Sequence, residues 1–433
     1  MNKKSNFTGL MPLIVFLVLF MGTGIITGDF GNMPLLLGMV IASAFALCLD
    51  KKGEDTSLEK KLDIFSKAGG EPTIILMVVI FLMAGAFYSV AEEMGAVSSM
   101  VNLGLSILPS NMVLPGLFIV SCILSFAMGT SMGTITAVAP IGVGLASQTG
   151  LSLPLVLGTV VGGAMFGDNL SFISDTTIAA TRTQGVELRD KFKANLLIVL
   201  PAVIITIIIL AFIPVTKAST KDYAYSIVEI LPYIAIIISA LVGLNVMLVL
   251  GIGIGVGAII GLALGHFNLV GLFATLQRGM EWMEDLAIIA IVVGGLVGLM
   301  DYYGGIDYLL EKVTANVKTK KGAQFGIATL VSLIDIATTN NTISIITAGP
   351  LAKDISKEYD IAPEKTASIL DIFSSAFQGL IPYGGQLLAA AGIGKISPVS
   401  IVPFSIYSML MIIMGILSIA LGFPKSKGKK KAL

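Results

Sequence analysis

Apolar stretches long enough to cross a lipid bilayer recur along the chain, separated by short polar segments. A helix rises 1.5 Å per residue and must cover roughly 30 Å of hydrocarbon, which takes about 20 apolar residues. The pattern predicts ten crossings, near residues 10–27, 33–49, 72–91, 153–180, 194–213, 228–244, 246–265, 286–301, 366–392 and 399–422. We therefore predict an all-α polytopic membrane protein.

Two further apolar segments, 112–147 and 323–352, are each interrupted at the centre by small polar residues. We interpret both as re-entrant hairpins, which enter and leave on one side and add no net crossing. The alternative is that each segment forms two full crossings.

The positive charges indicate the orientation, because Lys and Arg are retained on the cytoplasmic side of a membrane. With both termini in the cytoplasm, 23 of the 27 Lys and Arg residues fall on that side. We therefore predict a multi-pass protein of the cytoplasmic (inner) membrane with both termini cytoplasmic and the lipid bilayer as its surroundings.

The second half of the chain repeats the first at an offset of 210 residues, without gaps. The offset pairs Gly69 with Gly279, Glu71 with Glu281, Gly85 with Gly295, Gly95 with Gly305, Pro140 with Pro350, Thr130 and Ser131 with Asn340 and Asn341, and Asp168 with Gln378. We predict a first repeat over 1–215, with a hairpin at 112–147 and a broken helix at 153–180. The second covers 216–433, with a hairpin at 323–352 and a broken helix at 366–392. Each half has five crossings, an odd number, so the copies are inverted relative to one another, an architecture typical of transporters.

Composition and charge exclude several classes of protein. Hydrophobic residues make up 55% of the chain and charged residues only 12%, against roughly 25% charged in an ordinary soluble domain. The 27 basic and 27 acidic residues balance, so no net positive field exists to hold nucleic acid. The two cysteines, Cys48 and Cys122, lie in apolar stretches without Cys or His neighbours in sequence, which predicts neither disulfides nor zinc. We expect no cofactor.

The strongest candidate for chemistry is the polar segment GDNLSFISDTT at 167–177, since a central Asp in a membrane costs about 2.5 to 3.5 kcal/mol or more. Its oxygen-bearing side chains are Asp168, Asn169, Ser171, Ser174, Asp175, Thr176 and Thr177. Carboxylate, carbonyl and hydroxyl oxygens suit a small hard cation. Asp168 and Asp175 would lie about 10 Å apart on an unbroken helix, so their direct contact requires unwinding near Gly167. The alternative is an ordinary polar loop, which would leave two apolar segments too short to span.

Three more polar interruptions complete the predicted site. They are GTSMGT at 129–134, with Thr130, Ser131 and Thr134; TTNNT at 338–342, with Asn340, Asn341 and Thr342, preceded by Asp335; and the crossing that carries Asp371 and Gln378. The alternatives are a small-residue helix contact for the first, and helix ends or structural pairs for Asp335 and Asp371. We predict sodium at Asp168, Asn169, Asp175 and Ser131. The sequence shows no Lys or Arg within these patches, which favours a cation over an anionic ligand.

At GDNLSFISDTTIAATRTQG and GTSMGT the sequence resembles the NhaC-type sodium/proton antiporter family, within the ion transporter superfamily. The likeness covers nearly the whole chain from about Thr73. It implies an inverted-repeat fold with two hairpins and two unwound crossings that exchanges sodium for protons by alternating access. Some members move malate, lactate or amino acids. Phe172 stands where the commoner family pattern has proline, which places the chain in a divergent branch.

We therefore predict a secondary active transporter, a sodium/proton antiporter. A carboxylate near mid-membrane is protonated when empty and ionised when sodium offsets the cost of its charge, so the two ions compete. The alternative is sodium-coupled transport of a small organic solute, an amino acid or a carboxylate such as malate or lactate. An intramembrane aspartyl protease requires G-x-G-D, and Met165 breaks that pattern, so we expect no enzyme. Homodimers are common in families with this architecture.

Overall fold

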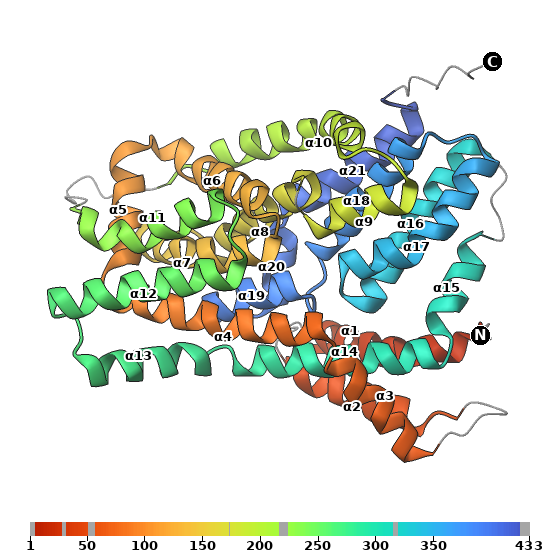
Figure 1. The fold of residues 1–433 in the computed structure, drawn as a ribbon, viewed down its shortest axis with the longest axis horizontal. Helices are drawn as coiled ribbons and strands as arrows, with labels where there is room; N and C mark the ends of the chain where they lie inside the picture. Colours follow the sequence, from red (N-terminus) through yellow and green to blue (C-terminus); the bar gives the residue numbers. More distant parts are fainter. Residues whose placement is uncertain are drawn as a thin grey trace.

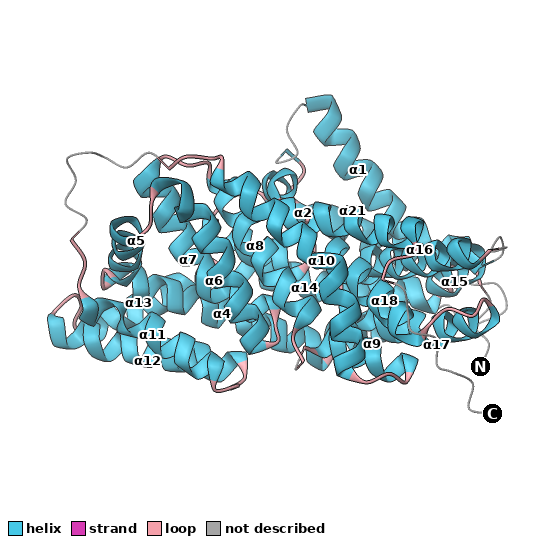
Figure 2. Ribbon diagram, turned by 90° about the horizontal axis from the view of Figure 1, so that it is seen from above, coloured by secondary structure: helices cyan, strands magenta, loops and turns pink. Residues whose placement is uncertain are grey.

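The computed structural model describes residues 5–27, 32–50, 57–172, 174–215, 224–314 and 319–424. The regular secondary structure of these residues is helical, without a strand among them (Figure 2). In this part of the chain, seven helical segments are long and apolar enough to cross a membrane, or eight if the bent pair Gly385–Gly394 and Pro398–Phe404 forms one span. The predicted all-α polytopic membrane fold is confirmed.

The first half of the chain forms α1 (Met11–Thr27), α2 (Leu35–Cys48), α3 (Leu58–Gly69), α4 (Pro72–Glu93), α5 (Ala96–Ile107), α6 (Val113–Met128), α7 (Ser131–Thr149), α8 (Leu153–Leu170), α9 (Asp175–Gln184) and α10 (Leu188–Ala211). The second half forms α11 (Ile227–Leu241), α12 (Val246–Leu264), α13 (Leu269–Glu281), α14 (Glu284–Tyr302), α15 (Gly305–Thr314), α16 (Lys320–Thr338), α17 (Asn341–Glu358), α18 (Pro363–Gln378), α19 (Gly385–Gly394), α20 (Pro398–Ile401) and α21 (Ile406–Leu421).

The helix boundaries repeat at the offset found in the sequence. Helices α7 and α17 begin 210 residues apart, at Ser131 and Asn341, and so do α9 and α19, at Asp175 and Gly385. The fold is thus two repeats of one helical pattern. Some predicted crossings are short helices, namely α2, α11 and α21, and the crossing at 366–392 is divided into α18 and α19. Counting only helices that are long and continuous enough to span therefore gives fewer crossings than the ten predicted from the apolar stretches of the sequence.

Glycines hold the two repeats together along one edge of the molecule, where α4 lies beside α12, α13 and α14 (Figure 1). A Cβ added to Gly85 would lie 2.0 Å from the Gly279 carbonyl oxygen, and one added to Gly279 would lie 2.2 Å from the Gly85 oxygen. Gly69 approaches Ile291 and Gly295 in the same way. Glycines that the offset pairs in sequence thus make crosswise contacts, because only small residues let helix backbones approach this closely in a membrane.

Each segment predicted as a hairpin is a helix pair joined by a tight turn, α6 with α7 and α16 with α17. The segment Ser110–Met128, which contains α6, is itself long and apolar enough to cross a membrane. Gly129 ends α6 in the left-handed region at φ 66°, and Thr339 ends α16 at φ 53°. The next residue caps the return helix in both cases: the Thr130 side chain accepts a hydrogen bond from the Gly133 amide, and the Asn340 side chain accepts one from the Ile343 amide. A β-branched residue rarely adopts positive φ, so the Thr339 turn is strained.

The broken helix of the first repeat opens later than expected. Helix α8 runs through Gly167 to Leu170, and the gap before α9 begins at Ser171. Gly167 serves close packing instead, since a Cβ there would lie 2.2 Å from the backbone nitrogen of Phe126 in α6. The unwinding near Gly167 that direct contact of Asp168 and Asp175 would require is not seen, and the break lies within the run of hydroxyl-bearing residues that follows.

Candidate functional site

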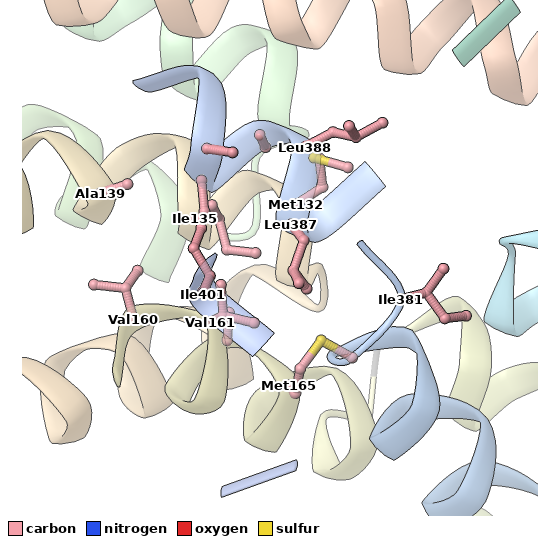
Figure 3. Packing of buried hydrophobic residues seen from close by; sticks show 14 of the residues in the cluster. Met132, Ile135, Ala139, Val160, Val161, Met165, Ile381, Leu387, Leu388 and Ile401 are labelled. Carbon is pink, nitrogen blue, oxygen red and sulfur yellow. The ribbon is translucent and has the colours of Figure 1, made fainter. Parts of the chain in front are cut away.

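Four interruptions of the helical structure meet inside the bundle: the two hairpin turns and the gaps between α8 and α9 and between α18 and α19. Helix α7 contacts α8 and α19, and α17 contacts α9 and α18. Apolar side chains pack around this region; Figure 3 shows Met132 of α7, Met165 of α8, and Ile381 and Leu387 from the second break among them. The surroundings of the polar centre are apolar, and their low dielectric constant strengthens electrostatic interactions within it.

The Asp168 carboxylate lies at the meeting point and is 6% exposed. Its Oδ2 atom accepts hydrogen bonds from the Ser131 hydroxyl at 2.9 Å and from the Asn341 amide at 3.1 Å. Its Oδ1 atom accepts one from the Ser174 hydroxyl at 2.9 Å, and the Thr176 hydroxyl donates to its backbone oxygen at 3.0 Å. One carboxylate therefore joins both hairpin turns to the break of α8.

The hydrogen bonds continue from Ser131 into the second repeat. The Gln386 amide donates to the Ser131 hydroxyl at 3.1 Å. The Gln378 amide in turn donates to the Gln386 side-chain oxygen at 2.6 Å and to the Thr339 carbonyl at 3.1 Å. The Gln378 side-chain oxygen is buried and has no hydrogen-bond partner in the described structure. The neutral second break is thus connected to Asp168 through the first hairpin.

A second polar cluster lies on the other side of the α8 break. Lys191 of α10 and Asp371 of α18 form an ion pair, and both side chains are fully buried. The Lys191 ammonium also donates to the Asn169 carbonyl at 2.5 Å and to the Thr177 hydroxyl at 2.8 Å. The Ser375 hydroxyl donates to the other Asp371 oxygen at 3.2 Å. The prediction that no Lys or Arg enters the central patches is wrong.

Most of the residues predicted from sequence lie at or next to these clusters. Ser131, Asp168, Ser174, Thr176 and Asn341 form the first cluster, and Asn169 and Asp371 belong to the second.

Others shape the backbone around them. Thr130 and Asn340 cap the return helices, and the Thr134 hydroxyl donates to the Thr130 carbonyl. The Thr342 amide donates to the Asn341 side chain. The Ser171 hydroxyl donates to the Phe126 carbonyl at 2.6 Å, which ties the break to α6.

Two predicted acids stand apart from the Asp168 hydrogen bonds. Asp175 is exposed at the first turn of α9, so the structure does not bring it to Asp168. Asp335 is fully buried in α16, and neither of its carboxylate oxygens has a hydrogen-bond partner in the described structure.

Sequence reasoning missed Lys191, Asn195 and Gln386. Lys191 lies between the predicted crossings 153–180 and 194–213, where the sequence indicates a flanking charge, but α10 begins before it, at Leu188. The spacing of the two residues could have indicated their role, because residues four apart lie on one face of a helix. Lys191 and Asn195 are so spaced, and they continue the buried face of α10 that runs through Ala202 and Thr206. Asn195 donates to the Asn169 side chain at 3.0 Å. Gln386 lies in the first turn of α19, and the sequence does not indicate which way its side chain points.

The arrangement around Asp168 suits a single hard cation. Carboxylate, hydroxyl and amide groups converge there, and such oxygen ligands are preferred by hard cations over nitrogen and sulfur. Within the described ranges no group of three or more His, Cys, Asp or Glu side chains is placed to hold a metal ion. Among these groups, the Asp168 side chain is the carboxylate that accepts the hydrogen bonds.

A family model described as the Na+/H+ antiporter family matches the chain twice, over residues 11–215 and 215–423. The chain is similar to the Na(+)/H(+) antiporter NhaC of Bacillus subtilis (strain 168), with 28% identity over 98% of this chain and 99% of that protein. Similarity to NhaC of Alkalihalophilus pseudofirmus is 24% over 92% and 93% of the two chains. Similarity to the Malate-2H(+)/Na(+)-lactate antiporter of Bacillus subtilis is 23% over 96% and 95%.

Proposed function

The chain belongs to the Na+/H+ antiporter family, and from this membership we propose that it is a transporter that exchanges sodium ions for protons. The observation that carries the proposal is the position of Asp168, whose buried carboxylate receives hydrogen bonds from both hairpin turns. The relatives that share nearly the full length of the chain are named as antiporters, which supports transport rather than catalysis.

Coupling follows from competition for one carboxylate. In the structure three donors satisfy the Asp168 oxygens. A sodium ion at Asp168 takes the place of these donors, and the Ser131 and Ser174 hydroxyls rotate to offer lone pairs. A proton on the carboxyl removes the charge that attracts sodium. The site therefore holds either ion but not both, which is the requirement for exchange.

Alternating access follows from the shared position of the site between the repeats. Ser131 belongs to the first hairpin and Asn341 to the second, so the hydrogen bonds of Asp168 link parts that the repeat places on opposite sides. Moving one hairpin away exposes the carboxylate to one side while the other hairpin still covers it. We take 1–215 and 216–433 as the two repeat units of this motion.

We propose Asp168, Ser131 and Ser174 as the sodium ligands, and Asn341 as a fourth once its side-chain amide turns its oxygen toward the ion in place of the nitrogen that donates to Asp168. Asn169 is a weaker candidate than the sequence indicated, because its carbonyl already accepts from Lys191 and its side chain accepts from Asn195.

The proposal is tested with purified protein in liposomes that contain a pH-sensitive dye. An imposed sodium gradient should change the internal pH, and Asp168→Asn should lower the initial rate by about 100-fold. The reason is that the hydrogen bonds and ion contacts of a charged group are worth about 1.5 to 3 kcal/mol each. The control is Asp175→Asn, an exposed acid in the same segment, which should keep the wild-type rate within about twofold. No sodium-dependent pH change with the wild-type protein would reject exchange.

Transport of an organic solute is the alternative. The full-length similarity to an antiporter named for malate and lactate raises it, but the geometry does not favour it. A solute carboxylate would face the negative charge of Asp168, and the buried ammonium of Lys191 is already paired with Asp371. Uptake of radiolabelled amino acids and small carboxylates, with and without sodium, decides between the two: accumulation of any one solute would favour the alternative.

We place the protein in the cytoplasmic membrane with both termini in the cytoplasm, as the charge distribution predicts. The start of α1 and the end of α21 lie toward the same end of the long axis (Figure 1), which supports that arrangement. Single cysteines introduced in α3 and in the 182–193 segment, labelled in intact cells, test this orientation. If a reagent that stays outside the cell labels them, the orientation is the opposite of the one proposed. We also propose that the protein forms a homodimer, and chemical cross-linking of the purified protein tests this.

A further inference from the structure

The Lys191 ammonium lies in a cage of oxygen atoms supplied by three helices or breaks. Asp371 Oδ2 of α18 is its ion-pair partner, and the Asn169 carbonyl at the end of α8 and the Thr177 hydroxyl of α9 accept its hydrogen bonds. The Thr177 hydroxyl also lies 3.2 Å from Asp371 Oδ2. A carboxylate, a backbone carbonyl at the end of α8 and a hydroxyl thus converge on one positive charge.

This set of oxygens is the chemistry of a cation site rather than of a simple surface salt bridge. Hard metal ions take carboxylate, carbonyl and hydroxyl oxygens as ligands, and a broken membrane helix leaves backbone carbonyls available for them. We propose that the Lys191 ammonium is a tethered cation that fills a second sodium-type site, and that removing its side chain opens this site to a free sodium ion.

The repeat supplies an independent argument. The offset of 210 places Ile401 opposite Lys191 and Val161 opposite Asp371, and both are fully buried apolar residues. Figure 3 shows Val161 and Ile401 among the packed side chains around α8. The fold therefore fills the equivalent position with apolar side chains in the other repeat. Apolar side chains can thus pack at these positions, so packing alone does not explain the Lys191–Asp371 pair. We explain the oxygen cage by the cation that it holds.

The cage adjoins the Asp168 site. Asn169 follows Asp168, and Thr177 follows Thr176, whose hydroxyl donates to the Asp168 backbone oxygen. The α8 break thus presents a site on each side, one closed by Lys191 and one left to Asp168. The fixed ammonium keeps Asp371 paired, so of these two carboxylates Asp168 alone is left to exchange ions. That last step rests on the proposed function; the existence of the second site does not.

The test is equilibrium binding of radioactive sodium to the purified full-length protein in detergent. Lys191→Ala removes the ammonium and leaves room for an ion with water, and it should bind one more sodium ion per chain than the wild type. Lys191→Arg keeps a cation in place and should bind as the wild type does. The double variant Lys191→Ile with Asp371→Val copies the other repeat, removes the site and should also match the wild type.

Several outcomes separate the possibilities. A folded Lys191→Ala protein that binds no additional sodium would overturn the proposal. If that variant is recovered only at high sodium, while the Ile and Val double variant is recovered without it, sodium has replaced the ammonium and the proposal stands. If the single variant is not recovered at any sodium concentration while the double variant folds, the proposal fails. If the wild type binds no sodium and Lys191→Ala binds one, the second site stands and the proposed exchange at Asp168 fails.

Discussion

The two broken crossings occupy equivalent places in the repeat but differ in charge. Asp168 lies near the end of α8 in the first crossing, and the offset puts Gln378 at the same place in α18. The hairpin turns that meet them differ less, with Ser131 in one and Asn341 in the other. The duplicated backbone thus builds two breaks and two turns, whereas one repeat alone supplies the carboxylate at this position.

The difference has a physical reason. Two carboxylates facing the same hairpin turns in a dry interior would repel each other, and one of them would be held neutral. The Gln378 amide avoids this cost and still donates hydrogen bonds, to Thr339 and Gln386. The backbone is therefore duplicated, whereas the carboxylate at this position, that of Asp168, is present once. In the proposed mechanism both hairpins reach this one exchange site, and the same carboxylate is exposed to each side of the membrane in turn.

The charged pair near the first break should show the largest effect on stability. Asp371→Val leaves the buried Lys191 ammonium without its carboxylate partner, and breaking one side of a buried pair costs about 3 to 5 kcal/mol. The melting temperature of the purified protein measures this. In Lys191→Ile with Asp371→Val, which carries the residues of the other repeat, most of that loss should be recovered. An equal loss in the single and double variants would show that the two positions are not equivalent.

The crosswise glycine contacts should show the next largest effect. Gly85→Ala places a Cβ against the Gly279 backbone, where no flexible side chain can move away, so we expect a loss of about 1 to 3 kcal/mol. Gly255→Ala in α12 is the matched control, because nothing lies within 4 Å of a Cβ at that position. Thermal unfolding of both variants tests whether the paired glycines set the separation of the repeats; similar melting temperatures would argue that they do not.

Much of this comparison is readable from the sequence, because it depends on local patterns. The offset of 210, the hairpin turns and the polar run after Gly167 all follow from spacing and composition. Contacts between distant segments do not. Asp175 is as polar as Asp168 in the sequence but is exposed in the first turn of α9. Lys191 looks like a flanking charge until the start of α10 and its neighbours in α9 and α18 are known.

The charged half of the comparison also predicts a pH dependence. In the proposed mechanism sodium binds the ionised Asp168 and a proton occupies the same carboxylate, so sodium affinity should fall as pH falls. With one proton displaced per ion, the apparent Kd should rise tenfold, about 1.4 kcal/mol, for each pH unit in the range where the empty site is protonated. Calorimetry at several pH values measures it. An affinity that is constant with pH would separate sodium binding from proton binding.

Substitution in the second broken crossing, which carries the neutral Gln378 at this position, should have the smallest effect on exchange. Gln378→Met keeps the length of the side chain and removes its hydrogen bonds to Thr339 and Gln386, at a net cost of about 0.5 to 1.5 kcal/mol. Because no charge is lost and Asp168 keeps its three donors, the exchange rate in liposomes should fall by less than about tenfold. A loss as large as that of Asp168→Asn would mean that the amide binds the ion itself and that both repeats contribute ligands equally. The assignment of the exchange chemistry to the first repeat would then be wrong, although the repeat itself would remain.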